Sequence, residues 1–136
     1  MMMHRVYIGL GSNTPDATKQ MSDAIDWLMT QLDEVASSDV YSTPPLSGIG
    51  PDYLNAVATG LTAMSNDQLN LLLKDYERQA GRTPQSKISG QVPIDLDIVV
   101  WDGTVVREKD FSYDFFQRGY RQVIAEMKAE RRDAER

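Results

Sequence analysis

Two aspartates separated by a single residue stand in the stretch Ile94-Asp95-Leu96-Asp97-Ile98, where apolar and acidic residues alternate. A period of two is typical of a strand with one buried face, so both carboxylates are predicted to point to the same side. Carboxylates about 6.5–7 Å apart along a strand can hold oxygen-seeking cations such as Mg²⁺, together with a polyphosphate. The alternative is a solvated polar face opposite a core, because two spaced aspartates alone are a weak signal.

The rest of the chain contains the elements that must position these acids. Apolar residues at three- and four-residue steps predict two helices, and a Ser65–Gln68 capping box with Gly81 marks the ends of the second. Asn55 lies inside a predicted strand, where asparagine is disfavoured; it is either a solvated edge residue or a buried amide that binds a polar ligand. The expected elements are strands over 5–10, 35–42, 53–61 and 94–101, and helices over 14–32 and 65–80.

This order, β-α-β-β-α-β, predicts an α+β, ferredoxin-like sandwich in which both helices cover one face of an antiparallel sheet. A turn at 102–103, a short strand over 104–106 and a charged helix over about 118–132 follow, while 107–117 is unassigned. We expect one domain, residues 1–136, with a core over about 5–106 and a C-terminal extension over 107–136. The open face should then carry Tyr53, Asn55, Asp95 and Asp97 together.

Composition excludes several classes of protein. The 136 residues carry a net charge of −6 and no cysteine, which excludes a disulfide framework and a thiolate zinc site. An acidic chain without a basic stripe is a poor nucleic-acid binder. No apolar run approaches the roughly 20 residues that span a membrane. We expect a cytoplasmic protein, monomeric or weakly dimeric, that binds small molecules.

Five short motifs, taken together, resemble the 6-hydroxymethyl-7,8-dihydropterin pyrophosphokinase family. They occur in the family's order and near its spacing, and the resemblance covers about residues 5–120. The motifs are Gly9-Leu10-Gly11-Ser12-Asn13, Tyr41-Ser42-Thr43-Pro44-Pro45-Leu46, Pro51-Asp52-Tyr53-Leu54-Asn55-Ala56, Glu77 with Gly81-Arg82, and Asp95-Leu96-Asp97-Ile98.

The resemblance implies Mg²⁺-dependent transfer of diphosphate from ATP to 6-hydroxymethyl-7,8-dihydropterin, with release of AMP, in folate biosynthesis. Asp95 and Asp97 match the ligands of two Mg²⁺ ions, and with Arg82 they match the catalytic set. The pterin residues that it implies are Thr43, Pro44, Leu46, Tyr53, Asn55 and Tyr120; the nucleotide residues are Glu77, Arg82, Lys87 and Arg118.

The loop between Arg82 and the acidic strand departs from the family. Pro84 stands where a second basic residue is expected, Ser89 replaces an aromatic residue and Val92 replaces an arginine. The segment after 104–106 also lacks a Pro-His element. We favour a working enzyme of reduced activity, in which Lys87, Arg118 or Arg121 compensates. The alternative is an impaired relative that binds pterin, nucleotide or both; a metal-dependent phosphohydrolase and a regulatory module are further candidates.

Overall fold

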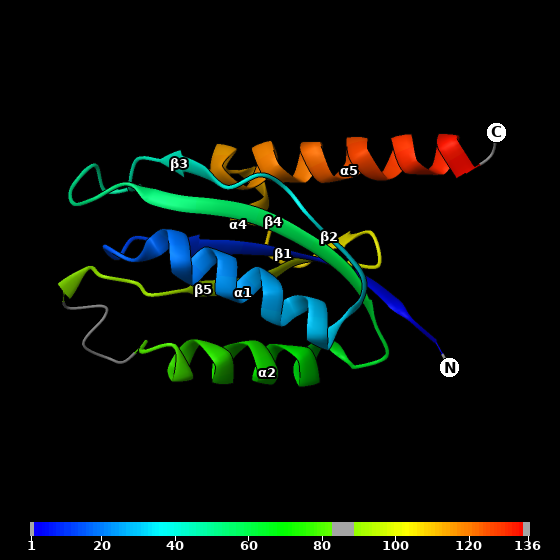
Figure 1. Ribbon diagram of the computed structural model, residues 1–136, viewed down its shortest axis with the longest axis horizontal. Coiled ribbons are helices and arrows are strands. Elements are labelled where there is room, and N and C mark those ends of the chain that lie inside the picture. Colours follow the sequence, from blue (N-terminus) through cyan, green and yellow to red (C-terminus); the bar gives the residue numbers. More distant parts are fainter. Residues whose placement is uncertain (1, 83–88, 135–136) are drawn as a thin grey trace.

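A computed structural model describes residues 2–82 and 89–134 and contains a six-stranded antiparallel sheet (Figure 1). The sheet order is β2-β4-β1-β5-β6, and β3 also pairs with β4. The predicted ferredoxin-like α+β fold is confirmed. The elements are β1 His4–Ser12, α1 Ala17–Gln31, β2 Asp33–Ser37, β3 Tyr41–Thr43, β4 Tyr53–Thr62, α2 Asn66–Gln79, β5 Asp95–Trp101, β6 Thr104–Val105, α4 Glu108–Ser112 and α5 Asp114–Ala134.

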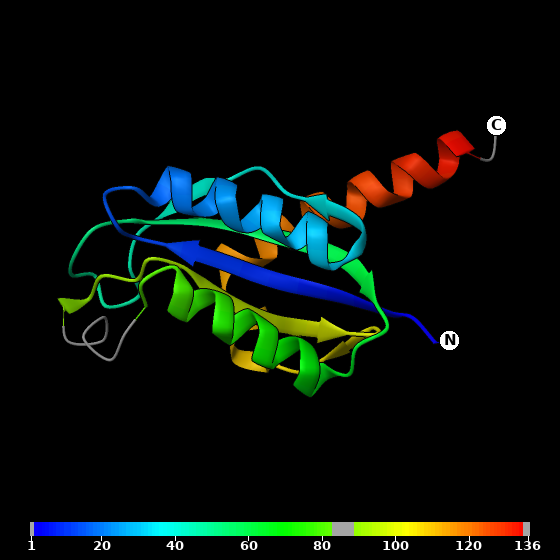
Figure 2. The same cartoon turned by 60° about the horizontal axis from the view of Figure 1, so that its bottom comes forward.

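Helices α1 and α2 lie side by side over one face of the sheet and bury the main core (Figure 2). The alternation predicted for β4 and β5 is confirmed, since Ala56, Ala58, Leu96 and Ile98 all pack beneath these helices. The capping box of α2 is also confirmed, because Ser65 and Gln68 exchange both hydrogen bonds. None of the helices in the described residues is long and apolar enough to cross a membrane.

Two predicted boundaries are wrong. The single strand expected over 35–42 is divided into β2 and β3, because Ser38 bonds Val57 through its own backbone N–H and its side-chain oxygen, which interrupts regular pairing. Helix α1 begins at Ala17 and not at Thr14-Pro15, since the Thr14 hydroxyl donates to Asp16 Oδ1 at 2.6 Å and does not cap the helix.

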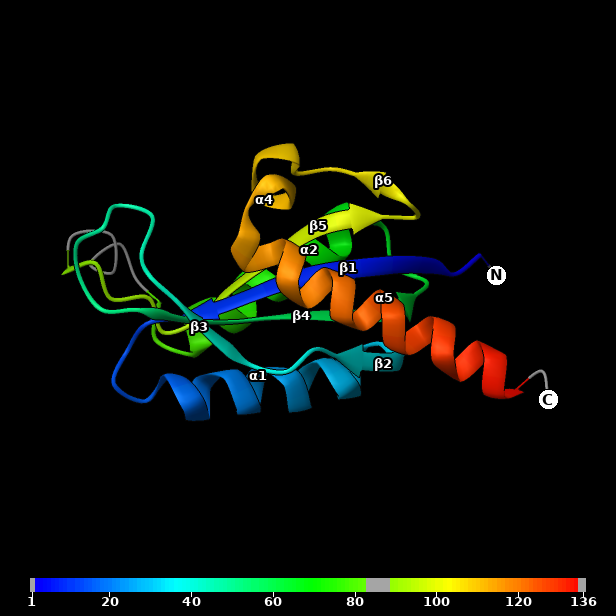
Figure 3. The ribbon, with the colours of Figure 1, turned by 90° about the horizontal axis from the view of Figure 1, so that it is seen from above.

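The second face of the sheet is only partly open. The segment left unassigned, 107–117, forms α4 and the first turn of α5, and α5 lies across β4 (Figure 3). Its close approach needs Gly119, where a Cβ would lie 2.8 Å from Tyr41 Oη and from Val57 Cγ2. The Tyr41 hydroxyl also donates to the Phe115 carbonyl and accepts from Gly119 N. Helix α5 therefore divides this face into a buried part and an exposed part.

The buried part is a second, smaller core formed by residues from the sheet and the C-terminal helices. A β-bulge contributes to it, because Val100 pairs with Tyr7 and Ile98 with Ile8, which leaves Val99 as the extra residue. Both valines consequently pack into the same cluster. Its buried members are Tyr7, Val57, Val99, Val100, Phe116 and Val123.

Candidate active site

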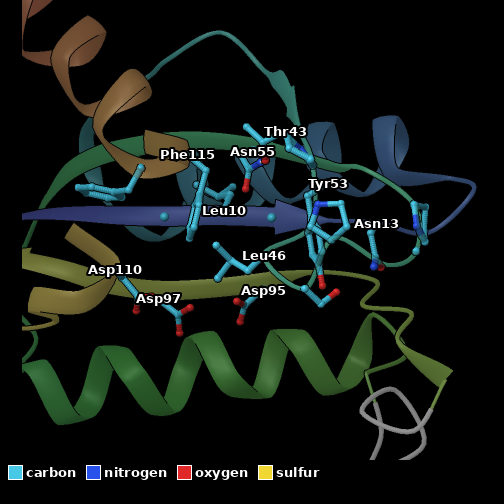
Figure 4. Close-up of a pocket in the computed structure, with 18 of the residues that line it drawn as sticks. Leu10, Asn13, Thr43, Leu46, Tyr53, Asn55, Asp95, Asp97, Asp110 and Phe115 are labelled. Carbon is cyan, nitrogen blue, oxygen red and sulfur yellow. The ribbon is translucent and has the colours of Figure 1, made fainter. Parts of the chain in front are cut away.

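A cavity of about 580 Å³ opens on the exposed part of the second face (Figure 4). Its floor is the carboxyl half of β1, and the loop between β3 and β4 forms one wall. The start of α5 contributes Phe115 and Phe116, and Asp110 of α4 lies at the rim. The cavity brings together most of the residues selected from the sequence: Thr43, Pro44, Leu46, Tyr53, Asn55, Asp95 and Asp97 all line it.

The β4 side of the cavity carries an amide beside an aromatic ring. Asn55 is 6% exposed, and its Nδ2 donates to Thr43 Oγ1 on the neighbouring strand β3. Tyr53 lies two residues before it on the same face of β4 (Figure 4). Of the two sequence interpretations of Asn55, the structure selects the buried amide. A flat heterocycle with polar edges fits this combination of ring, hydroxyl and amide.

The β5 side carries the two acids, each bonded to a cation. Arg82 Nη1 donates to Asp95 Oδ1 at 2.6 Å, and Lys74 Nζ donates to Asp97 Oδ1 at 3.1 Å. Arg107 Nη1 lies 3.9 Å from the same Asp97 oxygen. Burial and the neighbouring charge of Asp97 raise the pKa of Asp95 to about 6. Burial acts to raise the pKa of Asp97 too, but the Lys74 ammonium, a hydrogen bond with Asp95 and the charge of Arg107 together outweigh it and hold that pKa below its usual range.

Glu77 organises these cations from behind the strand. Within the described residues, β5 has no strand partner at Leu96 on the side away from β1, because β6 pairs only with Val100 and Trp101. The Glu77 carboxylate fills that edge: Oε2 accepts from Leu96 N at 2.8 Å and from Lys74 at 2.8 Å, while Oε1 accepts from Arg82 at 3.1 Å. Its side chain is 6% exposed, so Glu77 supports the site from below and does not line the cavity.

The donor set at this site fits a cation that also binds a substrate. Asp95 and Asp97 both line the cavity, whereas no group of three His, Cys, Asp or Glu side chains within residues 2–82 and 89–134 could hold a metal ion. Mg²⁺ is commonly held by one or two carboxylates together with substrate phosphates and water. Two carboxylates facing a large cavity match that arrangement, and a closed structural metal site would need more protein ligands.

Besides Glu77, three described residues selected from the sequence do not line the cavity: Arg82, which bonds Asp95, and Arg118 and Tyr120. Arg118 stacks on the Tyr41 ring, with its guanidinium carbon 4.7 Å from the ring centroid. Tyr120 packs in the second core, 5.0 Å from Tyr7 between ring centroids. Lys87 lies outside the described residues, as does Pro84.

Sequence reasoning also missed several residues of the site. Phe115 and Phe116 supply aromatic lining, and no local pattern distinguished them from core residues. Asn13 holds the end of the loop before β5, accepting from Val92 N and donating to the Gly90 carbonyl. A signal for Lys74 did exist, because it precedes Glu77 by three residues on a helix, the spacing of side chains that share one helix face.

The comparisons with known proteins agree on one family. The sequence model of 7,8-dihydro-6-hydroxymethylpterin-pyrophosphokinase matches residues 7–125. Three curated proteins, each named 2-amino-4-hydroxy-6-hydroxymethyldihydropteridine pyrophosphokinase, are similar to this chain. The protein of Aquifex aeolicus is 32% identical over 79% of this chain and 67% of its own length. That of Pseudomonas putida is 33% identical over 77% and 88%, and that of Haemophilus influenzae 30% identical over 87% and 77%.

Proposed function

Since the chain belongs to the 7,8-dihydro-6-hydroxymethylpterin-pyrophosphokinase family, we propose that the cavity on the second face is the site where diphosphate passes from ATP to the hydroxymethyl group of a dihydropterin. The chain is a diphosphotransferase of folate biosynthesis, and AMP is the second product. One observation carries the assignment of the site: the acid pair and the amide–aromatic group line the same cavity.

The pterin occupies the β4 side of the cavity. The Asn55 amide offers both a donor and an acceptor to the edge of the heterocycle, and Thr43 fixes the orientation of that amide. Tyr53 offers a ring for stacking, and Phe115 lies across the cavity from it (Figure 4). Such contacts hold the acceptor hydroxyl in a fixed place, which is the main requirement of phosphoryl transfer.

The triphosphate occupies the β5 side. The family uses ATP with Mg²⁺, and we place two ions on Asp95 and Asp97, where they would neutralise the charge of the phosphates. Arg82 and Lys74 both lie beside these acids and are near enough to transfer their hydrogen bonds to phosphate oxygens. The hydroxymethyl oxygen attacks the β-phosphorus, and the bond between that phosphorus and the bridging oxygen of AMP breaks.

The loop between Arg82 and β5 carries fewer basic residues than the family's loop, but α2 and the segment before α4 place other cations beside the acids. Lys74 and Arg107 both approach Asp97 and neither belongs to that loop. The comparisons give no support to a non-catalytic relative. We also propose that a single domain carries the whole activity, because the family match spans residues 7–125. The expected monomer or weak dimer stays a prediction.

The reaction products test the proposal directly. We expect the purified protein, given ATP, Mg²⁺ and 6-hydroxymethyl-7,8-dihydropterin, to form AMP and pterin diphosphate in equal amounts. ADP or free phosphate in place of AMP would show hydrolysis or single phosphoryl transfer, and binding of both substrates without AMP would show that transfer has been lost. Either result would contradict the proposal.

Replacement Asn55→Ala should weaken binding of the pterin by about 1–3 kcal/mol, because the heterocycle would keep its place but lose a buried hydrogen-bond partner. Titration of the pterin by fluorescence or calorimetry measures this loss. Asn70, which is exposed on α2, provides the matched control Asn70→Ala. If the two variants bind the pterin with equal affinity, Asn55 does not contact the pterin.

Metal binding should weaken at acid pH because Asp95, with a pKa near 6, must lose its proton before it can act as a ligand. The pKa is raised, so the protonated form is already populated just below pH 6. We expect the affinity for Mn²⁺ alone to be constant above that pH and to fall about tenfold per unit below it. Electron paramagnetic resonance of free Mn²⁺ measures the affinity. If the affinity of Asp95→Asn for Mn²⁺ falls in the same way below pH 6, the titrating group is not Asp95.

A further inference from the structure

The Lys74 ammonium has a separate acceptor for each of its three hydrogens. Nζ donates to Glu77 Oε2 at 2.8 Å, to the Leu96 carbonyl at 2.9 Å and to Asp97 Oδ1 at 3.1 Å. The side chain is 32% exposed, so it is largely withdrawn from solvent. Three simultaneous bonds hold the flexible lysine in one orientation, with its charge directed at the acid pair.

The bonds of Lys74 to Glu77 and to the Leu96 carbonyl complete the edge of the sheet, whereas the bond to Asp97 lies at the site. Glu77 and Lys74 together satisfy the N–H and carbonyl of Leu96, which pair with no strand in the part of the chain that the structure describes. That task does not involve Asp97, whose carboxylate lies on the cavity side of β5 (Figure 4). The bond to Asp97 is therefore additional to the structural role of Lys74.

The negative charges of Asp95, Asp97 and Glu77 are neutralised by cations that bridge them. Arg82 bonds Asp95 and Glu77, while Lys74 bonds Asp97 and Glu77, so each cation joins one site acid to the same buried carboxylate. A divalent cation that entered alone would be repelled by these two positive groups, and by Arg107, which lies 3.9 Å from Asp97 Oδ1. A triphosphate would offer Lys74 and Arg82 new acceptors, which removes that penalty.

We propose that Lys74 is a positioning residue that holds Asp97 as its counter-charge in the nucleotide-free protein, so that the divalent cation binds more weakly alone than together with the triphosphate. This inference rests on the proposed function, since it takes Asp97 as a metal ligand. Lysine suits the role, because a compact charge on a flexible stem can turn from the carboxylate to a phosphate oxygen without moving the helix.

The test compares two affinities in the full chain: Mn²⁺ alone, and Mn²⁺ with a non-hydrolysable ATP analogue. In Lys74→Met, Mn²⁺ alone should bind on the order of tenfold tighter, and the metal–nucleotide complex on the order of tenfold weaker. Lys74→Arg, which keeps the charge but cannot place one nitrogen among all three acceptors, should change both affinities in the same directions as Lys74→Met but less. Lys19→Met, a change of the same kind at an exposed position on α1, should alter neither.

Opposite shifts identify the proposed role, because a merely structural defect would weaken both affinities. Changes in the same direction in Lys74→Met, or no change in either, would overturn the inference. Lys74→Gln, which keeps a donor for Leu96 but loses the charge, gives the same comparison if the methionine variant does not fold. Asp97→Asn separates this inference from the proposed function: unchanged Mn²⁺ binding in that variant would reject the metal site itself, whatever Lys74 does.

Discussion

Asp97→Ala should lower the rate of AMP formation on the order of a thousandfold or more, the largest effect that we expect of any single substitution. Asp97 is one of the two acids of β5 that line the cavity, and it is the one whose charge is stabilised by Lys74. Without it the phosphates lose a cation that neutralises the charge of the transition state. Separation of AMP from ATP after timed incubation measures the rate.

An exposed aspartate on α1 gives a matched control, since Asp26→Ala removes the same carboxylate from the opposite side of the sheet. We expect wild-type turnover from that variant. The Asp97 variant should also fail to bind the Mg²⁺–nucleotide complex while still binding the pterin, because the two halves of the cavity lie on different strands. Turnover of Asp97→Ala within threefold of the control would reject the acid pair as the reaction centre.

Glu77→Ala should cause the largest loss of stability, about 2–3 kcal/mol in the free energy of unfolding. The change leaves Leu96 N, Lys74 and Arg82 without their common acceptor. The two cations are each about 30% exposed, so water recovers part of the loss and the value lies below that of a fully buried pair. Urea unfolding, followed by circular dichroism, measures the difference.

A substitution at Asp75, two residues before Glu77 on α2, separates the loss of the Glu77 contacts from a general effect on the helix. Asp75 pairs with Arg78 at the surface, so Asp75→Ala should cost less than about 0.5 kcal/mol. Glu77→Gln should lie between the two variants, because an amide oxygen can still accept from Leu96 N but carries no charge. A loss in Glu77→Ala no greater than that in Asp75→Ala would show that the carboxylate does not organise the edge.

Local patterns predicted much of the site. The alternation around Asp95 and Asp97 placed both acids on the face away from α1 and α2, and the same rule placed Tyr53 and Asn55 beside them. These predictions succeeded because the side-chain direction on a strand is a property of the strand itself. The capping box at Ser65 succeeded for the same reason, since both of its bonds lie within four residues.

The resemblance to the family placed two residues of α5, Arg118 and Tyr120, at the site, and neither of them lines the cavity. Tyr120 was expected at the cavity, but the helix seats Gly119 against Tyr41 and turns Tyr120 into the second core, which leaves Phe115 to line the cavity. Whether a ring on an amphipathic helix faces core or cavity depends on where that helix crosses the sheet. No spacing within the helix encodes that position.

By itself, the sequence determined the order of the main strands and helices, the two faces of β4 and of β5 as far as Ile98, and the pair of acids with an amide and a ring on the same side. Only the tertiary structure decided which cations reach the acids. Lys74 bonds Asp97 because α2 packs beside the edge of β5, where Glu77 accepts the hydrogen bond of Leu96 N. Contacts of this kind depend on the docking of separate elements, because each element alone exposes these groups to water.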